Sequence, residues 1–446
     1  MKILLINPSW DENLISKKGG KFNRPWPPLD LLNCGALLEK AGMQIEVIDA
    51  RATPIPLPEI VRKAAEADKV FLTSSPLDRW QCPNIEIERF FKIVEPFQKN
   101  NLYIMGVHGD RYPEIVLKRT GALCVALGEP EMTVLELAKT EDFKTVPGIA
   151  YLQNGQLVKT ENRPLIKMEE LPIPAYHLIN MDHYNYELMG NRFALLETTR
   201  GCPFNCMYCY LEMYGGRGYR RKTFEQMTAE LDYIINTVKA ESLYFIDLEF
   251  TLGESNHVHK LCDYMIEKKY NLPWCCQTRA NTINPELLKK MRQAGCQLIH
   301  FGVETGSEKI MPTIDKKITL AEIETGIAMT KKAGIEVACF FIFGFPGETR
   351  EDMEATIQFA KKINPTYASF HIASPFPGTP LYEMSETKEL FPETYLKEHT
   401  VEKLEKQVKR AFRKFYIRPA YAIARLMEGN PAIWKKQLRL FWAFTR

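Results

Sequence analysis

Residues 199–210 read Thr-Arg-Gly-Cys-Pro-Phe-Asn-Cys-Met-Tyr-Cys-Tyr, which places Cys202, Cys206 and Cys209 at C-x3-C-x2-C spacing. Thiolates at this spacing can ligate three irons of a cubane iron–sulfur cluster. Because the stretch supplies no fourth thiolate, one iron is left open to a different ligand. We therefore predict a [4Fe-4S] cluster that takes part in chemistry rather than one that only stores electrons.

A structural zinc site is the main alternative for these three cysteines. Zinc in such a site takes four ligands, usually as two separated pairs. The sequence contains no second CxxC pair and no HxxxH pair at the spacing of a zinc finger. The other eight cysteines lie scattered in apolar surroundings, as buried free thiols do. These are Cys34, Cys82, Cys124, Cys262, Cys275, Cys276, Cys296 and Cys339.

The chain has 446 residues, a length typical of two or three domains. Its eleven cysteines do not form the short framework of a secreted disulfide-rich domain, which favours a reducing, cytoplasmic location. The opening residues MKILLIN are too short for a signal peptide, and no apolar run approaches the roughly 18 residues of a membrane span. The P-loop, HExxH and GxSxG motifs are missing, so the sequence gives no support to nucleotide hydrolysis, zinc proteolysis or serine hydrolysis.

Five short β-rich runs alternate with helical patterns in residues 1–140, which predicts a doubly wound parallel sheet. The expected strands are 2–6, 45–48, 70–73, 102–105 and 124–127. In such a sheet a ligand binds beyond the carboxyl ends of the strands. The candidate binding residues of this domain lie in the loops at those ends: Pro8, Ser9, Thr73, Ser74, Ser75, Gly106, Val107, His108, Gly128, Glu129 and Glu131.

A hairpin with Asn154-Gly155 as its turn and a proline-rich segment follow, and we expect residues 141–190 to link two domains. From residue 193 six strand-and-helix units resume. Their expected strands are 193–198, 243–248, 274–278, 298–303, 337–343 and 367–372. Active sites of parallel barrels lie at the carboxyl ends of the strands, where the cysteine stretch and several polar residues fall.

With Tyr208 as the aromatic residue of the CxxxCxΦC signature, the cysteine stretch resembles that of the radical S-adenosylmethionine (SAM) superfamily. The resemblance implies a partial (βα)6 TIM barrel in which the open iron is chelated by SAM. An electron from the reduced cluster then cleaves SAM to a 5′-deoxyadenosyl radical, with a reductant such as flavodoxin or ferredoxin as partner.

The resemblance also implies SAM contacts at the ends of the later strands. Asp247 and Glu249 would face the methionyl amino group, although either carboxylate alone could equally cap a loop. The Gly302-Val-Glu-Thr-Gly306 run is similar to a family element in which the acid, here Glu304, faces SAM. Gly344 would contact adenine or make an ordinary βα turn. The complete expected set is Tyr208, Asp247, Glu249, Gln277, Arg279, Glu304, Ile342 and Gly344; no catalytic acid or base is assigned.

The N-terminal domain resembles the cobalamin-binding domain that precedes many radical SAM domains. The similarity rests on the segments NPSW, PPLDLLNCGALLEKAG, VIDA, GVHGDRYPEIVL and ALGEPEMTVLEL. The chain departs from the family at Gly106-Val107-His108, and it has no DxHxxG motif to supply a histidine to cobalt. A Rossmann-like, flavodoxin-like domain that has lost its cofactor is the alternative.

The C-terminal segment is basic, with twelve Lys or Arg against three Glu from Val401 to Arg446. Its residues Leu438, Leu440, Phe441, Trp442 and Phe444 are interleaved with the charge. This pattern predicts either a helical pair packed on the protein or a peripheral contact with an anionic membrane. A lipophilic organic substrate would suit the second case, and we expect no nucleic acid partner.

These patterns predict four parts: residues 1–140 as the cobalamin-binding domain, 141–190 as the linker, 191–385 as the barrel and 386–446 as a C-terminal helical extension. The resemblance implies a cobalamin-dependent radical SAM methyltransferase acting on an unactivated carbon or phosphorus centre. A cyclase or rearrangement enzyme without methyl transfer is the alternative, since AFRKFYIRPAYAIARL is similar to the anaerobic magnesium-protoporphyrin monomethyl ester cyclase branch. A non-catalytic cobalamin or redox sensor is a third hypothesis.

Overall fold

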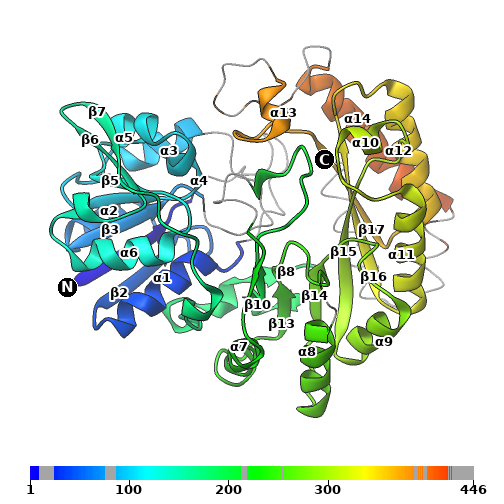
Figure 1. The fold of residues 1–446 in the computed structure, drawn as a ribbon, viewed down its shortest axis with the longest axis horizontal. Coiled ribbons are helices and arrows are strands. Elements are labelled where there is room, and N and C mark those ends of the chain that lie inside the picture. The colour runs from blue at the N-terminus through cyan, green and yellow to red at the C-terminus, as the bar shows by residue number, and fades with distance from the viewer. Residues whose placement is uncertain are drawn as a thin grey trace. The chain divides into compact units, whose positions relative to one another are not determined.

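The computed structural model describes residues 1–9, 25–75, 87–211, 218–253, 256–385, 390, 392, 394, 399–419, 421 and 423. The chain divides into two compact units, whose elements are labelled in Figure 1. The first unit comprises Met1–Tyr186, Gly190–Leu196 and Leu211–Glu241. The second comprises Glu187–Met189, Glu197–Tyr210 and Ser242–Arg446.

The first sheet has seven strands in the order β2-β1-β3-β4-β5-β6-β7. Its first five strands in chain order pair in parallel, and each overlaps the range expected from its apolar run. The strands are β1 (Lys2–Asn7), β2 (Gln44–Asp49), β3 (Lys69–Thr73), β4 (Leu102–Met105), β5 (Cys124–Ala126), β6 (Ile149–Gln153) and β7 (Gln156–Lys159).

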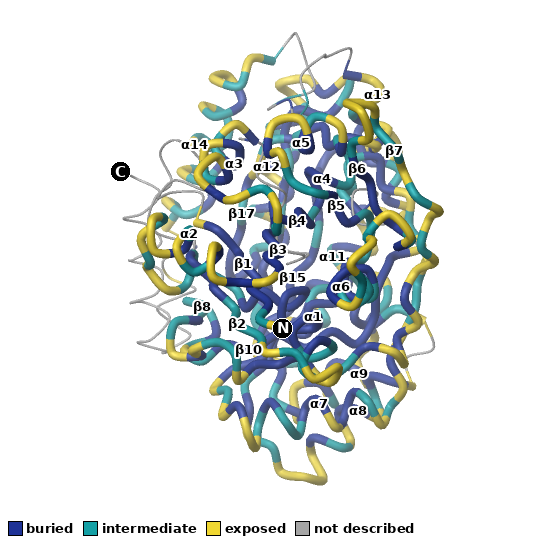
Figure 2. The backbone as a smooth tube through the Cα atoms, turned by 90° about the vertical axis from the view of Figure 1, so that its left-hand side faces the viewer, coloured by how far each residue is buried: buried dark blue, intermediate teal, exposed yellow. Residues whose placement is uncertain are grey.

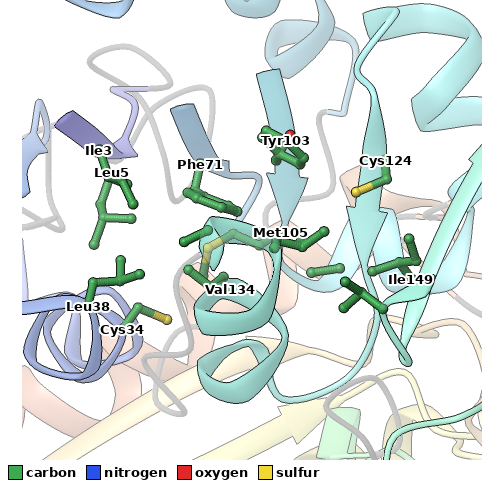
Figure 3. Close-up of a cluster of buried hydrophobic side chains, with 14 of the residues drawn as sticks. Ile3, Leu5, Cys34, Leu38, Phe71, Tyr103, Met105, Cys124, Val134 and Ile149 are labelled. Carbon is green, nitrogen blue, oxygen red and sulfur yellow. The ribbon is translucent and has the colours of Figure 1, made fainter. Parts of the chain in front are cut away.

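Helices α1 and α6 pack on one face of this sheet and close its core (Figure 3). In that core Cys34 and Leu38 of α1 meet Leu5 of β1, while Val134 of α6 lies near Met105 of β4. The helices of this region are α1 (Leu29–Lys40), α2 (Leu57–Ala65), α3 (Ile87–Val94), α4 (Val107–Arg111), α5 (Pro113–Thr120) and α6 (Pro130–Lys139). Short 3-10 turns follow at Phe143–Thr145, Met168–Glu170, Tyr176–Leu178 and Met181–His183.

The hairpin forms where the sequence places it, but it does not stand apart as a linker. Asn154 and Gly155 take φ angles of 52° and 78°, the left-handed values that a two-residue hairpin turn requires. Strand β6 pairs antiparallel with β5, so the hairpin extends the first sheet. Strand β6 is apolar on both faces where it begins: Ile149 and Ala150 point to opposite faces, and both are fully buried, which suits a strand inside the sheet.

The second sheet has the order β10-β13-β14-β15-β16-β17, and its strands from β13 onward pair in parallel. The strands are β10 (Phe193–Leu196), β13 (Ser242–Phe245), β14 (Trp274–Gln277), β15 (Cys296–Glu304), β16 (Glu336–Phe343) and β17 (Tyr367–Ile372). Most residues of these strands are buried, and Figure 2 colours the backbone by burial. Two-residue strands are β8 (Asn185–Tyr186), β9 (Gly190–Asn191), β11 (Thr199–Arg200) and β12 (Arg220–Arg221).

Helices follow the later strands, as the repeating pattern predicts. They are α7 (Phe224–Asn236), α8 (Asn256–Glu267), α9 (Pro285–Gln293), α10 (Ile310–Thr313), α11 (Leu320–Lys332), α12 (Arg350–Ile363), α13 (Pro380–Glu383) and α14 (Val401–Tyr416). Thr223, Thr319 and Thr349 begin α7, α11 and α12 with complete capping boxes. Such a box satisfies two backbone N–H groups that a helix start would otherwise leave unpaired, and so fixes where each helix begins.

Parts of several expected segments lie outside the described residues. These parts are Trp10 of the first loop, residues 76–86 after the third strand, residues 212–217 after the cysteine stretch and residues 424–446 of the basic tail. Within the portion of the chain that is described, no helix is both long and apolar enough to cross a membrane.

Two helix glycines give a matched test of packing. A Cβ at Gly326 of α11 would lie 2.3 Å from the backbone oxygen of Ala280, whereas one at Gly35 of α1 would meet the movable end of Leu178 at 2.8 Å. Alanine is intrinsically favoured over glycine in a helix by about 1 kcal/mol. We expect Gly326→Ala to lower the free energy of unfolding by about 1–3 kcal/mol because backbone cannot move aside. Gly35→Ala should be neutral or stabilising; equal effects in urea denaturation would contradict this account.

Candidate functional site

The three cysteines of residues 199–210 lie in one loop after β11. Cys202 and Cys206 are buried, Cys209 is half-buried, and all three are free thiols. Main-chain hydrogen bonds hold the loop from both sides, since Met207 N donates to Ile314 O and Leu381 N donates to Met207 O, each at 3.1 Å. The loop is therefore fixed by segments that follow two later strands.

The environment of Cys202 opposes its ionisation in the protein alone. Burial, followed by the Glu249 carboxylate and the other two cysteines, raises the pKa of Cys202 to about 12. In the described ranges, no three His, Cys, Asp or Glu side chains are arranged to hold one metal ion. The donor set is nevertheless that of an iron–sulfur site, because soft thiolates bind iron and positive iron would offset their mutual repulsion.

Asp247 follows β13 and is fully buried. Its carboxylate accepts hydrogen bonds from the Thr198 hydroxyl at 2.8 Å and the Thr199 hydroxyl at 2.5 Å. Burial raises the pKa of Asp247 to about 6, while the two hydroxyl groups lower it. Its position therefore fixes the two residues that lead into the cysteine loop.

Glu249 lies two residues further along. Its carboxylate accepts a hydrogen bond from the backbone N–H of Arg279 at 2.8 Å. Burial raises the pKa of Glu249 to about 7, and Lys316 and Arg279 act in the opposite direction. Gln277 donates from its side-chain amide to Leu248 O at 3.3 Å. The ends of β13 and β14 are thus joined to each other.

The Arg279 guanidinium lies 3.9 Å from the centre of the ring of Phe204, a residue of the cysteine loop. It donates to the backbone oxygens of Lys316 and Lys317, the second at 3.0 Å. Its Nε has no acceptor among the residues that the structure describes. Arg279 therefore connects the cysteine loop to the segment after α10, and its contact with SAM stays a prediction.

Glu304 ends β15 in an ion pair that is almost closed to solvent. Its Oε1 accepts from Lys316 Nζ at 2.8 Å, and each side chain of the pair is only 8% exposed. Lys316 Nζ also lies 3.3 Å from the Tyr208 hydroxyl. Glu304 has a φ of 66°, where a side chain other than glycine is strained by about 1–3 kcal/mol.

Gly302 makes room for this arrangement. A Cβ there would lie 2.2 Å from Glu304 Oε1 and 2.8 Å from Lys316 Nζ. The pairing of β15 with β16 shifts register between Gly302 and Glu304, a bulge that turns the end of the strand. The strand end is thus shaped to bring the carboxylate onto the lysine.

Lys316 is the principal site residue that the sequence analysis missed. Burial acts to lower its pKa, but the Glu304 carboxylate raises that pKa above its ordinary value. The sequence shows two adjacent lysines, Lys316 and Lys317, and only the fold buries the first. Positive φ angles at Asp315 and Lys317, 51° and 55°, form the turn that points Lys316 inward.

The loop after β16 is shaped by its own acid. Gly344 has a φ of 98°, and its N–H donates to Glu348 Oε2 at 2.5 Å. Phe345 N donates to the same oxygen at 3.2 Å, and the Phe345 ring lies 5.5 Å from that of Tyr208. Glu348, one place late for the family element, thus caps its own turn. Ile342 is half-buried near the end of β16.

In the first sheet, the strand order reverses between β1 and β3, the position where doubly wound sheets bind ligands. Asn7 and Thr73 end these two strands, and both are buried. Within the described part of the chain, Asn7 Oδ1 and Thr73 Oγ1 have no hydrogen-bond partner. Pro8 is buried and Ser9 is exposed beside them.

Gly106 brings the fourth strand's loop close to the third. A Cβ at Gly106 would lie 2.9 Å from Thr73 Oγ1 and from the backbone of Ser75. His108 is buried, as is Val107, and its Nδ1 lies 3.2 Å from Ser74 Oγ. Small residues and unpaired polar atoms therefore gather at one point of the sheet edge.

The loop after the fifth strand is held by one ion pair and several hydrogen bonds that the sequence did not predict. Glu129 accepts from Arg220 Nη2 at 2.7 Å and from Ile166 N at 2.9 Å, so its carboxylate has a structural role. Gly128 N donates to Asp110 Oδ1 at 2.8 Å. Glu131 is buried and accepts from Asn33 at 3.4 Å.

The chain is similar to several known proteins. Residues 196–360 match the family model of the radical SAM superfamily. An uncharacterized methyltransferase of Pyrococcus horikoshii is 31% identical, over 98% of this chain and 97% of that protein. The anaerobic magnesium-protoporphyrin IX monomethyl ester cyclase of Cereibacter sphaeroides is 26% identical, over 88% and 65%.

Among solved structures, the radical S-adenosylmethionine methyltransferase TsrM from Kitasatospora setae, with cobalamin and a [4Fe-4S] cluster bound, has a similar fold. The TM-score is 0.68 at 16% identity, over 86% of this chain and 74% of that one. At this identity the similarity concerns the fold alone. It confirms the expected fold class.

Glu348 should make the stability of the protein depend on pH. Burial raises its pKa from 4.5 to about 7; the Gly344 and Phe345 amides and Lys309 lower it, and Asp352 raises it. Stability from the neutral form is therefore present below pH 4.5 and lost as the pH rises through about 7. We expect Glu348→Gln to flatten this fall by up to about 1.4 kcal/mol per pH unit in urea denaturation.

The control for this prediction is Glu267→Gln, at an exposed residue that ends α8. It should leave the pH dependence of the unfolding free energy as in the wild type. Equal slopes for Glu348→Gln and the wild type would contradict the assignment of this titration to Glu348.

Proposed function

Because this chain belongs to the radical SAM superfamily, we propose that it is a cobalamin-dependent radical SAM methyltransferase acting on an unactivated carbon or phosphorus centre. The observation that carries the proposal is the buried Glu304–Lys316 pair beside Tyr208 of the three-cysteine loop. When bound, the [4Fe-4S] cluster and SAM supply a 5′-deoxyadenosyl radical, and cobalamin supplies the methyl group. Cys202, Cys206 and Cys209 would hold the cluster.

The paired charges suit the methionyl group of SAM, whose amino and carboxylate groups would bind the open iron. Glu304 would accept a hydrogen bond from the amino N–H, and Lys316 would donate a charge-assisted hydrogen bond to the carboxylate. Both residues can make these contacts while they remain paired, so neither buried charge is left uncompensated. Asp247, Glu249 and Arg279 would act around this pair, chiefly by fixing the loops that carry it.

Cobalamin would bind at the carboxyl ends of the first sheet. Asn7 and Thr73 offer unpaired polar atoms there, and Gly106 keeps that corner clear of side-chain atoms. Ser74, Ser75 and the loop at Gly128 would line the remainder, whereas Glu129 would support the loop through its pair with Arg220. A structural neighbour with cobalamin bound supports this placement.

Methyl transfer is preferred to cyclisation because the relative that is similar over nearly the whole chain is named a methyltransferase. Because one relative is named a cyclase, cyclisation without methyl transfer is the alternative reaction. Under either reaction, we propose a lipophilic organic substrate, a flavodoxin or ferredoxin as reductant and a cytoplasmic location.

Loss of one cluster thiol should abolish SAM cleavage. The protein is reconstituted anaerobically with iron, sulfide and hydroxocobalamin, reduced with dithionite and assayed for 5′-deoxyadenosine. We expect Cys202→Ala, Cys206→Ala and Cys209→Ala to lose the cluster absorption and the product, because each thiolate ligates a separate iron. Cys262→Ala removes a buried thiol of α8 and should keep both. Full activity in the three loop variants would contradict the proposed cluster site. Failure of the wild type to bind hydroxocobalamin would contradict the proposed use of cobalamin.

The Lys316 assignment is tested by SAM affinity. We expect Lys316→Met to weaken SAM binding to the reconstituted protein by roughly 10- to 100-fold, since one charge-assisted contact is lost. The double variant Glu304→Gln, Lys316→Met buries no unpaired charge and should show the same loss. Lys317→Met is the control, because that side chain is 71% exposed. Wild-type affinity in both Lys316 variants would remove this residue from the SAM site.

A further inference from the structure

Helix α14 lies far along the chain from the cysteine loop and belongs to the C-terminal extension. Thr400 caps its start, accepting from Lys403 N at 3.4 Å. Leu404, Ala411 and Phe415 are its fully buried residues and form one face of the helix. The helix therefore packs on the second unit through a continuous apolar stripe.

The end of α14 is attached to β17, the last strand in the order of the second sheet. The Tyr416 hydroxyl accepts from Ala368 N and donates to Ala368 O, each at 2.9 Å. Tyr421 donates from its hydroxyl to Thr366 O at 2.7 Å. These bonds satisfy backbone groups that an edge strand would otherwise expose, so the extension covers this edge.

The middle of α14 is attached to α12, the helix that directly follows the Gly344–Glu348 loop. The Glu354 carboxylate accepts from Arg410 at 2.5 Å and from Lys414 at 2.7 Å. Arg418 donates to Lys361 O at 3.0 Å and to Asn364 Oδ1 at 2.5 Å. The helix thus has a fixed position relative to α12, which follows this loop, and to β17, which pairs with the strand before it.

The start of α14 reaches the loop itself. Leu404 is 1% exposed, and its Cδ1 lies 2.9 Å from the place of a Cβ on Gly344. His399 Nε2 lies 3.1 Å from Glu348 O. A leucine side chain therefore packs directly against the backbone of a residue held at a φ of 98°.

We propose that α14 is a positioning element of the SAM site, in which Leu404 and His399 hold the Gly344–Glu348 loop in its binding shape. The inference rests on the proposed function, because it takes this loop as the one that contacts adenine. Leu404 touches no reacting atom and acts through Gly344. Without it the glycine loses the packing that restricts its backbone, and SAM must order the loop at a cost to its affinity.

The test compares Leu404→Ala with Leu287→Ala, a buried leucine of α9 in the same unit. Hydrogen–deuterium exchange is measured on the protein without cofactors, and SAM affinity and cluster content on the reconstituted protein. We expect Leu404→Ala to speed exchange at residues 344–348 by roughly tenfold and to weaken SAM binding by a similar factor at normal cluster content. Leu287→Ala should change neither quantity, although both variants lose stability.

Two further variants keep the proposal falsifiable if Leu404→Ala folds poorly. Leu404→Met, which conserves volume, should restore wild-type exchange, and His399→Ala should speed exchange at the same residues. Unchanged exchange at 344–348 in Leu404→Ala and His399→Ala would overturn the positioning role. Failure of the wild type to bind SAM would instead overturn the proposed function, while the exchange result would stand by itself.

Discussion

The ion pair between Glu304 and Lys316 is the interaction on which the second unit's functional end depends. A buried pair repays its desolvation only when both charges are present and well placed, and removing one partner leaves an uncompensated charge. The chain meets that condition with a bulge at Gly302, a strained φ at Glu304 and a turn that points Lys316 inward. The bulge and the strained backbone lie at the carboxyl end of a strand, which is where enzymes with parallel barrels have their active sites.

Around this pair, three acids hold backbone in place. Asp247 binds the hydroxyl groups before the cysteine loop, Glu249 binds the N–H of Arg279, and Glu348 binds the turn at Gly344. Burial raises the pKa of all three, as expected for carboxylates removed from water. Asp247 and Glu249 thus fix segments that belong to neighbouring strands, whereas Glu348 fixes its own loop after β16, and helix α14 packs against that same loop.

The sequence predicts the elements better than their contacts. Strands β4 and β17 have the expected bounds because each is a short β-rich run with polar or turn-forming residues near both ends, and Asn154-Gly155 specifies its turn locally. The pairing of β6 with β5 could not be predicted, since the hairpin signal does not say which strand lies beside it. The cysteine spacing and Glu304 were found from local motifs. Lys316 and the Glu129–Arg220 pair, 91 residues apart, exist only once the chain has folded.

The central claim is that SAM binds through its methionyl group at the open iron, next to Glu304 and Lys316. The most direct measurement is electron paramagnetic resonance with hyperfine detection on the reduced, reconstituted protein, using SAM labelled with 15N in the amino group and 17O in the carboxylate. Our account predicts that both labels couple to the cluster spin. A cluster spectrum that SAM leaves unchanged, with neither label coupled, would contradict it.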